Sequence, residues 1–340
     1  MNPFSEILNG KNPNRPPVWF MRQAGRILPE YQQLRQQYSF RELMETPQLA
    51  CDVTLMPVNL LNTDAAILFS DILVIPQALG LDLEFTDKGP VFQTPLLKHS
   101  HPENALNPQP EKLEYIYQAI DLIISQKPED VPLIGFCGGP LTVLLYMLEG
   151  LGTKSDFRNA ERFIINNQKA TEKIVDTVTA ITIEYARQQI RHGADCFRLF
   201  ESNCGNIPYI IYNQIFLPSV KKVCAAVRAL NRKFFYFAKG IGAGISTITP
   251  DVCDYISIDW QTDIYTARKL LHKDIEIEGN FDPRILLSSE NQIETELQKY
   301  KPFAEENPKW IFNLGHGVLP ETPFENAKFF VKKAKEIFTR

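Results

Sequence analysis

Eight short runs of apolar, β-branched and aromatic residues recur along the chain, and this recurrence restricts the possible folds more than any other feature. Each run is nearly continuous in apolar character rather than strictly alternating, which is typical of strands that are buried on both faces. The runs are VWFMR (18–22), AAILFS (65–70), LIGFCG (133–138), CFRLFE (196–201), KFFYFAK (233–239), YISIDW (255–260), IEIEG (275–279) and WIFNLGH (310–316). They predict eight strands.

Helical spacing of apolar residues separates these predicted strands. The helices are expected at 29–38, 47–61, 156–191 as one long or two shorter helices, and near 214–230, 263–272, 290–300 and 323–338. Eight strands that alternate with helices predict an α/β fold, a (β/α)8 TIM barrel that forms a single domain over residues 1–340. The alternative is a doubly wound sheet, which would more often carry an early glycine-rich phosphate turn, and the sequence has none.

The segment 81–110 interrupts the alternation. LDLEFTDKGPVFQTPLL (81–97) predicts a small hairpin that turns at TDKG, and a loop rich in proline and asparagine follows it. Loops of this length often form lids or rim segments.

The net charge and the cysteine content restrict the kinds of ligand that the chain can bind and the compartment in which it works. A formal net charge of −4 argues against a general nucleic-acid or membrane-surface binder, so an anionic ligand would need a local cluster of cations. The six cysteines form no C-x-x-C pair and are expected to be reduced and buried, which suits a cytosolic protein. We also expect no signal peptide, transit peptide or membrane span.

Polar or glycine residues end every predicted strand. These ends are Arg22, Ser70–Asp71, Gly138–Gly139, Glu201–Ser202, Lys239, Asp259, Asn280 and His316. Because the carboxyl ends of barrel strands hold the active site, we expect these residues to converge on one mouth.

The first of these ends, MRQAGR, places Arg22 and Arg26 around Ala24 and Gly25. Small residues let a ligand approach the backbone, and the planar guanidinium fork binds carboxylates with two hydrogen bonds. The two arginines therefore predict an anion site, with surface ion pairs as the alternative. Arg35 on the next helix could face the mouth or the solvent.

Other strand ends offer candidates with two interpretations each. Asp71 could be a helix cap or could stabilise a cation on a substrate. The glycines of FCGGPLT are interpreted as leaving open space at the mouth, and Tyr146 on the following helix could pack in the core or reach a ligand. His316 is bracketed by glycines after the eighth run, which favours a position facing the mouth.

Cofactor and metal motifs are missing from the sequence. KGIGAGI (239–245) lacks the third glycine of a dinucleotide-binding turn, and the pair in HSH (99–101) has no third ligand nearby. No P-loop, G-x-S-x-G or zinc-type Cys/His spacing occurs. We therefore expect an enzyme that uses no metal and no organic cofactor.

Taken together, the motifs resemble those of the uroporphyrinogen decarboxylase family. The similar stretches are PVWFMRQAGRILPEY, ILFSDIL, GFCGGPLT with YMLEG, FESNCG, FAKG, Asp259–Trp260, GNFDP and FNLGHGVLPETP, in an order that runs from residue 17 to about 323. Departures from the family pattern fall beside the charged positions, at Ile27, Gly139, Leu141, Asn203 and Cys204.

The resemblance implies a cytosolic TIM barrel, usually a homodimer, that acts in heme and porphyrin biosynthesis without a cofactor. The implied reaction removes the carboxyl groups of the four acetate side chains of uroporphyrinogen III and yields coproporphyrinogen III. The residues implied to line the substrate site are Arg22, Gln23, Ala24, Gly25, Arg26, Arg35, Asp71, Tyr146, Ser202 and His316, with Asp71 and Arg22 as the catalytic pair.

That chemistry suits the residue types. Protonation of the pyrrole carbon beside an acetate makes the ring cationic, and an anionic Asp71 near the pyrrole nitrogens would stabilise that cation more than the neutral ring. Two proton donors are possible. Arg22 lies near the place where an acid is needed, although arginine is a poor acid, and a water held by Arg22 or His316 is the alternative. The rival hypotheses are a barrel methyltransferase that uses a corrinoid protein and zinc, and a non-catalytic binder of tetrapyrroles.

Overall fold

Six parallel strands form the central sheet of the computed structural model, which describes residues 1–86, 89–150 and 156–340. Their order in the sheet is β1 (Ala66–Ile67), β4 (Leu133–Gly138), β5 (Cys196–Glu201), β6 (Lys233–Ala238), β7 (Tyr255–Ser257) and β8 (Glu276–Glu278). Each strand lies inside one of the apolar runs that predicted it.

The first and last apolar runs close this sheet into a ring. Val18 forms a parallel bridge with Phe312, and Glu278 at the end of β8 forms another with Ile311. On the other side, the Asp64 amide donates to the Val18 carbonyl over 2.8 Å. The two runs are held by isolated bridges rather than by long ladders, and they supply the two missing positions of an eight-membered barrel. The predicted (β/α)8 fold is therefore confirmed, and the doubly wound sheet is excluded.

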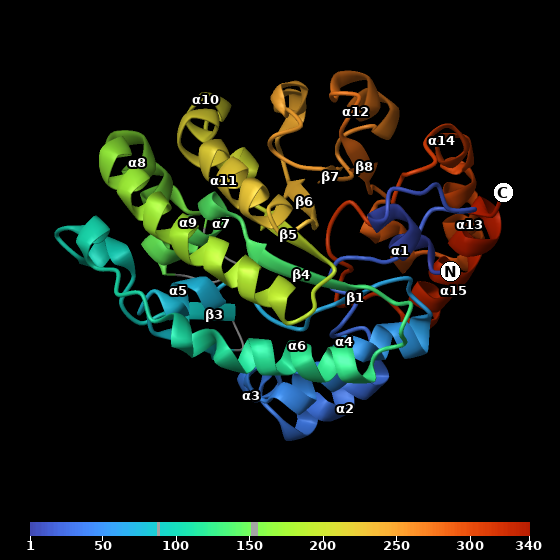
Figure 1. Cartoon of the computed structure of the whole chain (residues 1–340), viewed down its shortest axis with the longest axis horizontal. Coiled ribbons are helices and arrows are strands. Elements are labelled where there is room, and N and C mark those ends of the chain that lie inside the picture. The colour runs from blue at the N-terminus through green and yellow to red at the C-terminus, as the bar shows by residue number, and fades with distance from the viewer. Residues whose placement is uncertain (87–88, 151–155) are drawn as a thin grey trace.

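Helices surround the strands on the outside of the ring (Figure 1). They are α1 (Pro3–Leu8), α2 (Pro29–Gln37), α3 (Phe40–Glu45), α4 (Pro47–Leu61), α5 (Val74–Ala78), α6 (Glu114–Gln126), α7 (Pro140–Glu149), α8 (Arg158–Asn166), α9 (Gln168–Arg191), α10 (Tyr209–Ile211), α11 (Leu217–Arg228), α12 (Ile264–Leu270), α13 (Glu290–Gln298), α14 (Lys301–Glu306) and α15 (Phe324–Phe338). All the predicted helices are present, and the segment 156–191 contains two.

The amino end of the barrel is covered by α1. Its first turn is capped by the Asn2 side chain, whose Oδ1 accepts from the Phe4 amide over 2.8 Å. The Phe4 ring stacks on Phe235 of β6 with 6.0 Å between ring centroids. Apolar packing of α1 therefore covers this end of the barrel.

The predicted hairpin is present as β2 (Leu83–Thr86) and β3 (Gly89–Phe92), which pair in antiparallel register. Its expected turn falls on residues 87–88, outside the described residues. The loop that follows contains short 3₁₀ turns at Leu96–Lys98, Pro102–Asn104 and Pro110–Leu113. All six cysteines are buried and free, as predicted. Within the described ranges, no helix is long and apolar enough to cross a membrane.

Candidate active site

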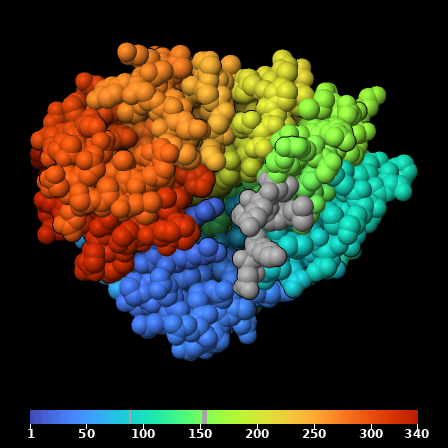
Figure 2. All heavy atoms as spheres, turned by 180° about the vertical axis from the view of Figure 1, so that it is seen from behind, coloured from blue at the N-terminus to red at the C-terminus, as the bar shows by residue number. Residues whose placement is uncertain are grey.

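The carboxyl ends of the strands open on one face of the molecule, opposite α1. Figure 2 shows that this face is hollowed at its centre and ringed by segments from the whole length of the chain. Asp71, Tyr146, Ser202 and His316 are partly accessible to solvent, and Arg22 and Arg26 are exposed. The predicted site residues thus come from segments that follow different strands.

Arg22 lies on the loop after the first barrel strand in a left-handed backbone conformation, with φ of 65°. A residue with a Cβ atom rarely adopts this conformation without support from its neighbours. The support comes from Met21, whose amide donates to Asn313 Oδ1 over 3.2 Å and whose carbonyl accepts from the Val318 amide over 2.9 Å. The last barrel segment therefore fixes the loop that carries the arginine.

Three of the predicted residues lie within electrostatic range of one another. Burial among protein atoms lowers the pKa of the Arg22 guanidinium, while the nearby Tyr146 and Asp71 raise it in part. Among the described residues, no carboxylate lies within ion-pair distance of Arg22 or Arg26, so neither arginine forms the surface ion pair that was the alternative. Their charges are available for an anionic ligand.

Asp71 has one oxygen in use and one free. Its Oδ1 accepts from the Leu73 amide over 2.8 Å, whereas Oδ2 has no hydrogen-bond partner in the described ranges. Burial raises the pKa of this carboxyl group, and the Leu73 amide and Arg22 oppose that shift. Asp71 therefore forms a local turn with Leu73 without capping α5, whose N-cap is Leu73, and presents a free acceptor near Arg22.

Tyr146 lies on α7, one of whose ends is fixed by Glu201. The Glu201 carboxylate accepts from the Leu141 amide over 3.0 Å, from the Thr142 amide over 2.6 Å and from the Thr142 hydroxyl. Helix amides near the N-terminus favour such an anion, but complete burial raises the pKa of Glu201 to about 7. Glu201 is thus a cap that orients α7, and Ser202 beside it is the partly accessible residue of this strand end.

The two glycines before α7 do not leave open space at the mouth, and that interpretation of FCGGPLT was wrong. A Cβ atom on Gly138 would lie 2.7 Å from Val143 Cγ2, and one on Gly139 would lie 2.6 Å from the Glu201 carboxyl carbon. The glycines are needed because Ile72, Val143 and Glu201 occupy the space. They allow close packing rather than ligand access.

His316 is partly accessible and lies between two cations. Burial, together with the positive charges of Arg22 and Lys239, lowers the pKa of its imidazole to about 4. The ring is therefore neutral near pH 7, and it can donate or accept one hydrogen bond rather than supply a full charge. The adjacent Phe237 and Trp260 rings meet it edge-on, with centroids at 6.3 and 5.7 Å.

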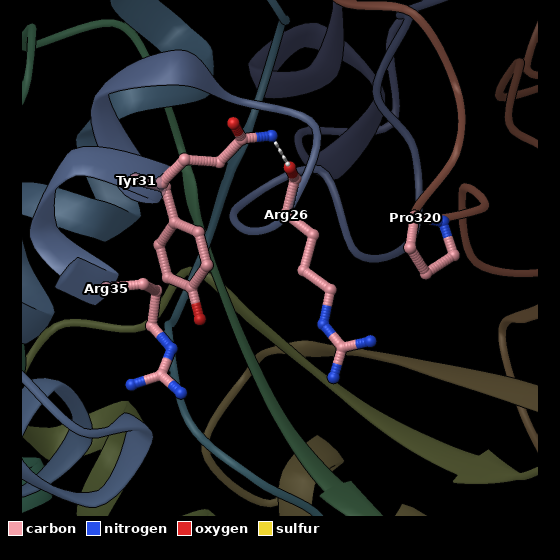
Figure 3. A pocket seen from close by; sticks show the side chains of 5 residues that line it. Arg26, Tyr31, Arg35 and Pro320 are labelled. Atoms are coloured by element: carbon pink, nitrogen blue, oxygen red, sulfur yellow. Dashed lines mark hydrogen bonds between the residues drawn. The ribbon is translucent and has the colours of Figure 1, made fainter. Parts of the chain in front are cut away.

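Arg26 and Arg35 line a pocket of about 390 Å³ with Tyr31, Gln32 and Pro320. Figure 3 shows their guanidinium groups on either side of the Tyr31 side chain, pointing the same way. Gln32 Nε2 donates to the Arg26 carbonyl over 2.8 Å, and one nitrogen of Arg35 donates to the Tyr38 carbonyl over 2.6 Å. Arg35 thus lies beside Arg26 with its side chain exposed to solvent, and its contact with a ligand at the mouth stays a prediction.

Gln23 is the predicted site residue that the structure directs away from the hollow. Its side chain is fully buried, with Nε2 donating to the Ala65 carbonyl over 2.8 Å and Oε1 accepting from the Phe20 amide over 3.2 Å. These bonds tie the arginine loop to the second barrel segment. Ala24 is partly accessible and Gly25 is buried.

A buried polar cluster beneath the mouth was missed from the sequence. Arg198 of β5 and Glu278 of β8 form an ion pair inside the barrel, with side chains 1% and 0% exposed. Glu278 Oε1 also accepts from Trp19 Nε1 over 2.8 Å and from Asn313 Nδ2 over 3.2 Å. Since Asn313 also holds the Met21 amide, this cluster connects the barrel interior to the Arg22 loop.

Gly317 is expected to be indispensable for the position of Arg22. A Cβ atom at residue 317 would lie 2.4 Å from Arg22 Cδ, so Gly317→Ala must displace the arginine side chain. We expect kcat/KM to fall by about 10²-fold, the effect of a displacement of roughly 1 Å at a reacting centre. Steady-state kinetics measure the loss and thermal unfolding serves as the control. An unchanged kcat/KM would show that the position of Arg22 does not matter.

In the described part of the chain, no group of three or more His, Cys, Asp or Glu residues is placed to hold a metal ion. The His99 and His101 pair lies in the rim loop with exposed side chains.

Known proteins similar to this chain fall into one family by sequence. The family model for uroporphyrinogen decarboxylase (URO-D) matches residues 1–337. The uroporphyrinogen decarboxylase of Geobacter metallireducens is 38% identical over 332 residues, with 97% of each chain covered. That of Trichlorobacter lovleyi is 39% identical over 334 residues, with the same coverage.

Solved structures support the fold at lower identity. A methyltransferase from Methanosarcina mazei superposes with a TM-score of 0.76 at 18% identity, covering 98% of this chain and 97% of that one. A B12-independent methionine synthase from Shewanella sp. W3-18-1 gives a TM-score of 0.57 at 13% identity, with 86% and 87% covered. At these identities the similarity shows a shared barrel fold and nothing about function. The full-length sequence matches decide the family, and this chain belongs to the uroporphyrinogen decarboxylase family.

Proposed function

We propose that the chain catalyses the decarboxylation of uroporphyrinogen III, removing carbon dioxide from its four acetate side chains to give coproporphyrinogen III in heme biosynthesis. The observation that carries the proposal is the free Oδ2 of Asp71, a partly buried anion near Arg22, which has no carboxylate ion-pair partner among the described residues. An octacarboxylate with pyrrole N–H donors at its centre complements both features.

Asp71 acts through its negative charge rather than by proton transfer. Its free oxygen accepts hydrogen bonds from the pyrrole N–H groups, and its negative charge stabilises the cation that forms when the ring carbon beside an acetate is protonated. The electrons of the C–CO2 bond then neutralise the ring as carbon dioxide leaves, and the acetate carbon becomes an exocyclic methylene. Protonation of this methylene and loss of the ring-carbon proton give the methyl group and restore the pyrrole, so one proton replaces each carboxylate in the net reaction.

Arg22 holds the reacting acetate and the water beside it. Guanidinium groups are poor acids, and the lowered pKa of His316 leaves the imidazole without a spare proton near neutrality. The proton is therefore taken from water that Arg22 orients, while Arg26 and Arg35 bind carboxylates at the rim. Tyr146, Ser202 and His316 contribute hydrogen bonds, and the small, partly accessible Ala24 lets the macrocycle approach the arginine loop closely.

We propose further that residues 1–340 form one barrel domain, that the chain works in the cytosol as a homodimer, and that catalysis requires no metal or organic cofactor. The family's substrate and the length of the sequence match support these statements.

A turnover assay tests the proposal. The purified chain is expected to convert uroporphyrinogen III to coproporphyrinogen III under anaerobic conditions, with the products identified after oxidation. Excess chelator should leave the rate unchanged, which separates this activity from that of a zinc-dependent methyltransferase. A folded protein that binds reduced substrate without releasing carbon dioxide would identify a tetrapyrrole binder instead.

A further inference from the structure

A second positive region lies across the mouth from the arginine loop. Arg22 follows the first of the eight barrel segments and Lys239 follows the fifth, so the two residues belong to opposite sides of the ring. Resting on the proposed function, we propose that Lys239 is a further substrate-binding residue, which takes a carboxylate of the porphyrinogen on the side away from Arg26 and Arg35.

The Lys239 ammonium group has no counterion in the described ranges. It forms no ion pair with Asp or Glu there, although its side chain is only partly accessible. Its charge also contributes to the lowered pKa of His316, which places it at the mouth rather than outside the barrel. A half-buried cation without a partner has a desolvation cost, and an anionic ligand would remove that cost.

The base of Lys239 is held rigidly. Its amide donates to the Glu201 carbonyl over 3.0 Å, and its carbonyl accepts from the Gly205 amide over 3.2 Å. Asp259, at the end of the neighbouring strand, forms no ion pair with Lys239 within the described ranges, and its two oxygens are held by backbone amides. They accept from the Gly240 amide over 2.7 Å and from the Gln261 amide over 3.0 Å.

Trp260 orients the lysine side chain. The Lys239 Nζ atom lies 5.7 Å from the Trp260 ring centroid, within the range of a cation–π contact. Arg284 approaches the same ring, with its Cζ at 5.8 Å, but its guanidinium is bound to Asp282 by three hydrogen bonds. Of the two cations on this ring, Lys239 is therefore the one that is free to bind an anion.

The chemistry of the substrate requires such a residue. Its carboxylates radiate from the rim of a macrocycle, so the arginines on one side of the mouth can meet only those that face them. Carboxylates on the far side, near the fifth strand, would otherwise enter a partly buried region with no cation to pair with. Lys239 supplies that charge next to the neutral His316.

Substitution of Lys239 tests this role. Lys239→Met is expected to raise KM for uroporphyrinogen about tenfold or more, the effect of losing one hydrogen bond to a charged group, with kcat within about twofold. Lys239→Arg should restore most of the affinity. The increase of KM with salt should also be shallower in Lys239→Met than in the unmodified chain, because one charge pair is missing.

Lys233→Met is the matched control. Lys233 begins the same strand at the other end of the barrel, where its Nζ lies 3.3 Å from Asp254, so the substitution removes the same charge away from the mouth. Its KM should be unchanged. If Lys239→Met has an unchanged KM and salt dependence, or only a lower melting temperature, the inference is overturned and the lysine is structural.

The two proposals can fail separately. The dissociation constant of uroporphyrin, a stable octacarboxylate, is measured by fluorescence quenching for all four proteins. If the unmodified chain binds uroporphyrin without turning over uroporphyrinogen, the proposed function fails while the Lys239 inference is still judged by the dissociation constants. Equal constants for Lys239→Met and the unmodified chain would refute the inference.

Discussion

Asp71→Asn is expected to lower kcat for uroporphyrinogen by about 10²–10³-fold, the range found when one preorganised electrostatic group is removed from an active site. Asparagine retains an Oδ1 that can accept from the Leu73 amide, so the local turn survives. In place of the free Oδ2 it presents an NH2 group, which repels pyrrole N–H donors and carries no charge. The loss should therefore appear in kcat, while the melting temperature changes little.

The pH profile gives an independent measurement of the same role. Burial raises the pKa of Asp71 above its ordinary value, although the Leu73 amide and Arg22 limit the shift. Only the ionised carboxylate stabilises the cationic ring, so activity should be present above this raised pKa and should fall as the pH drops through it. Plotting kcat/KM against pH should show this acidic limb for the unmodified chain and not for Asp71→Asn.

A surface carboxylate provides the control for Asp71. Asp121 pairs with His192 on the outside of the barrel, and its side chain is 58% exposed. Asp121→Asn removes the same charge without touching the mouth, so kcat and the acidic limb should stay as they are. Equal turnover by the Asp71→Asn variant, or an unchanged acidic limb, would remove Asp71 from the mechanism.

The barrel could be predicted because its signal is local and repeated. Each strand is a continuous apolar run, and burial on both faces leaves that pattern in the sequence whatever the neighbouring strand is. The pattern does not tell how regularly a run pairs. The runs around Val18 and Phe312 have the same apolar pattern as the other six, yet they pair only through isolated bridges. The bridge that closes the ring joins residues almost 300 positions apart, a contact that no local pattern reveals.

The site could be predicted as a set of strand ends, but not as a set of contacts. Asp71, Tyr146 and His316 all lie within electrostatic range of Arg22, since their positions at strand ends follow from the barrel itself. What Gln23 and Glu201 bind depends on tertiary partners, the Ala65 carbonyl and the amides of α7, which no local pattern reveals. Both side chains are buried, and they hold neighbouring segments in place rather than face the opening.

One signal for the buried cluster was present and was not used. Arg198 interrupts CFRLFE, and Glu278 interrupts IEIEG, although both runs were assigned to buried strands. A charge within a buried strand requires a partner of opposite charge, because an unpaired ion is strongly disfavoured there. Two such interruptions of opposite sign would have predicted an ion pair across the barrel.

Arg198→Met is expected to lower the free energy of unfolding by about 3–5 kcal/mol, because it leaves Glu278 buried without its cation. The substitution also removes contacts of the guanidinium with the Trp19 and Phe235 rings, whose centroids lie 4.6 and 5.3 Å from Arg198 Cζ. Denaturant unfolding measures the loss, on condition that the transition is reversible and two-state.

The double variant Arg198→Met, Glu278→Leu separates the unpaired charge from lost packing. Apolar residues in place of both partners leave no buried ion, so much of the stability should return. Activity should not return with it, because Glu278 accepts from Asn313 Nδ2, and Asn313 holds the Met21 amide next to Arg22. A stable but weakly active double variant would show that the cluster positions the arginine loop. A double variant as unstable as Arg198→Met would instead assign the loss to packing around Trp19 and Phe235.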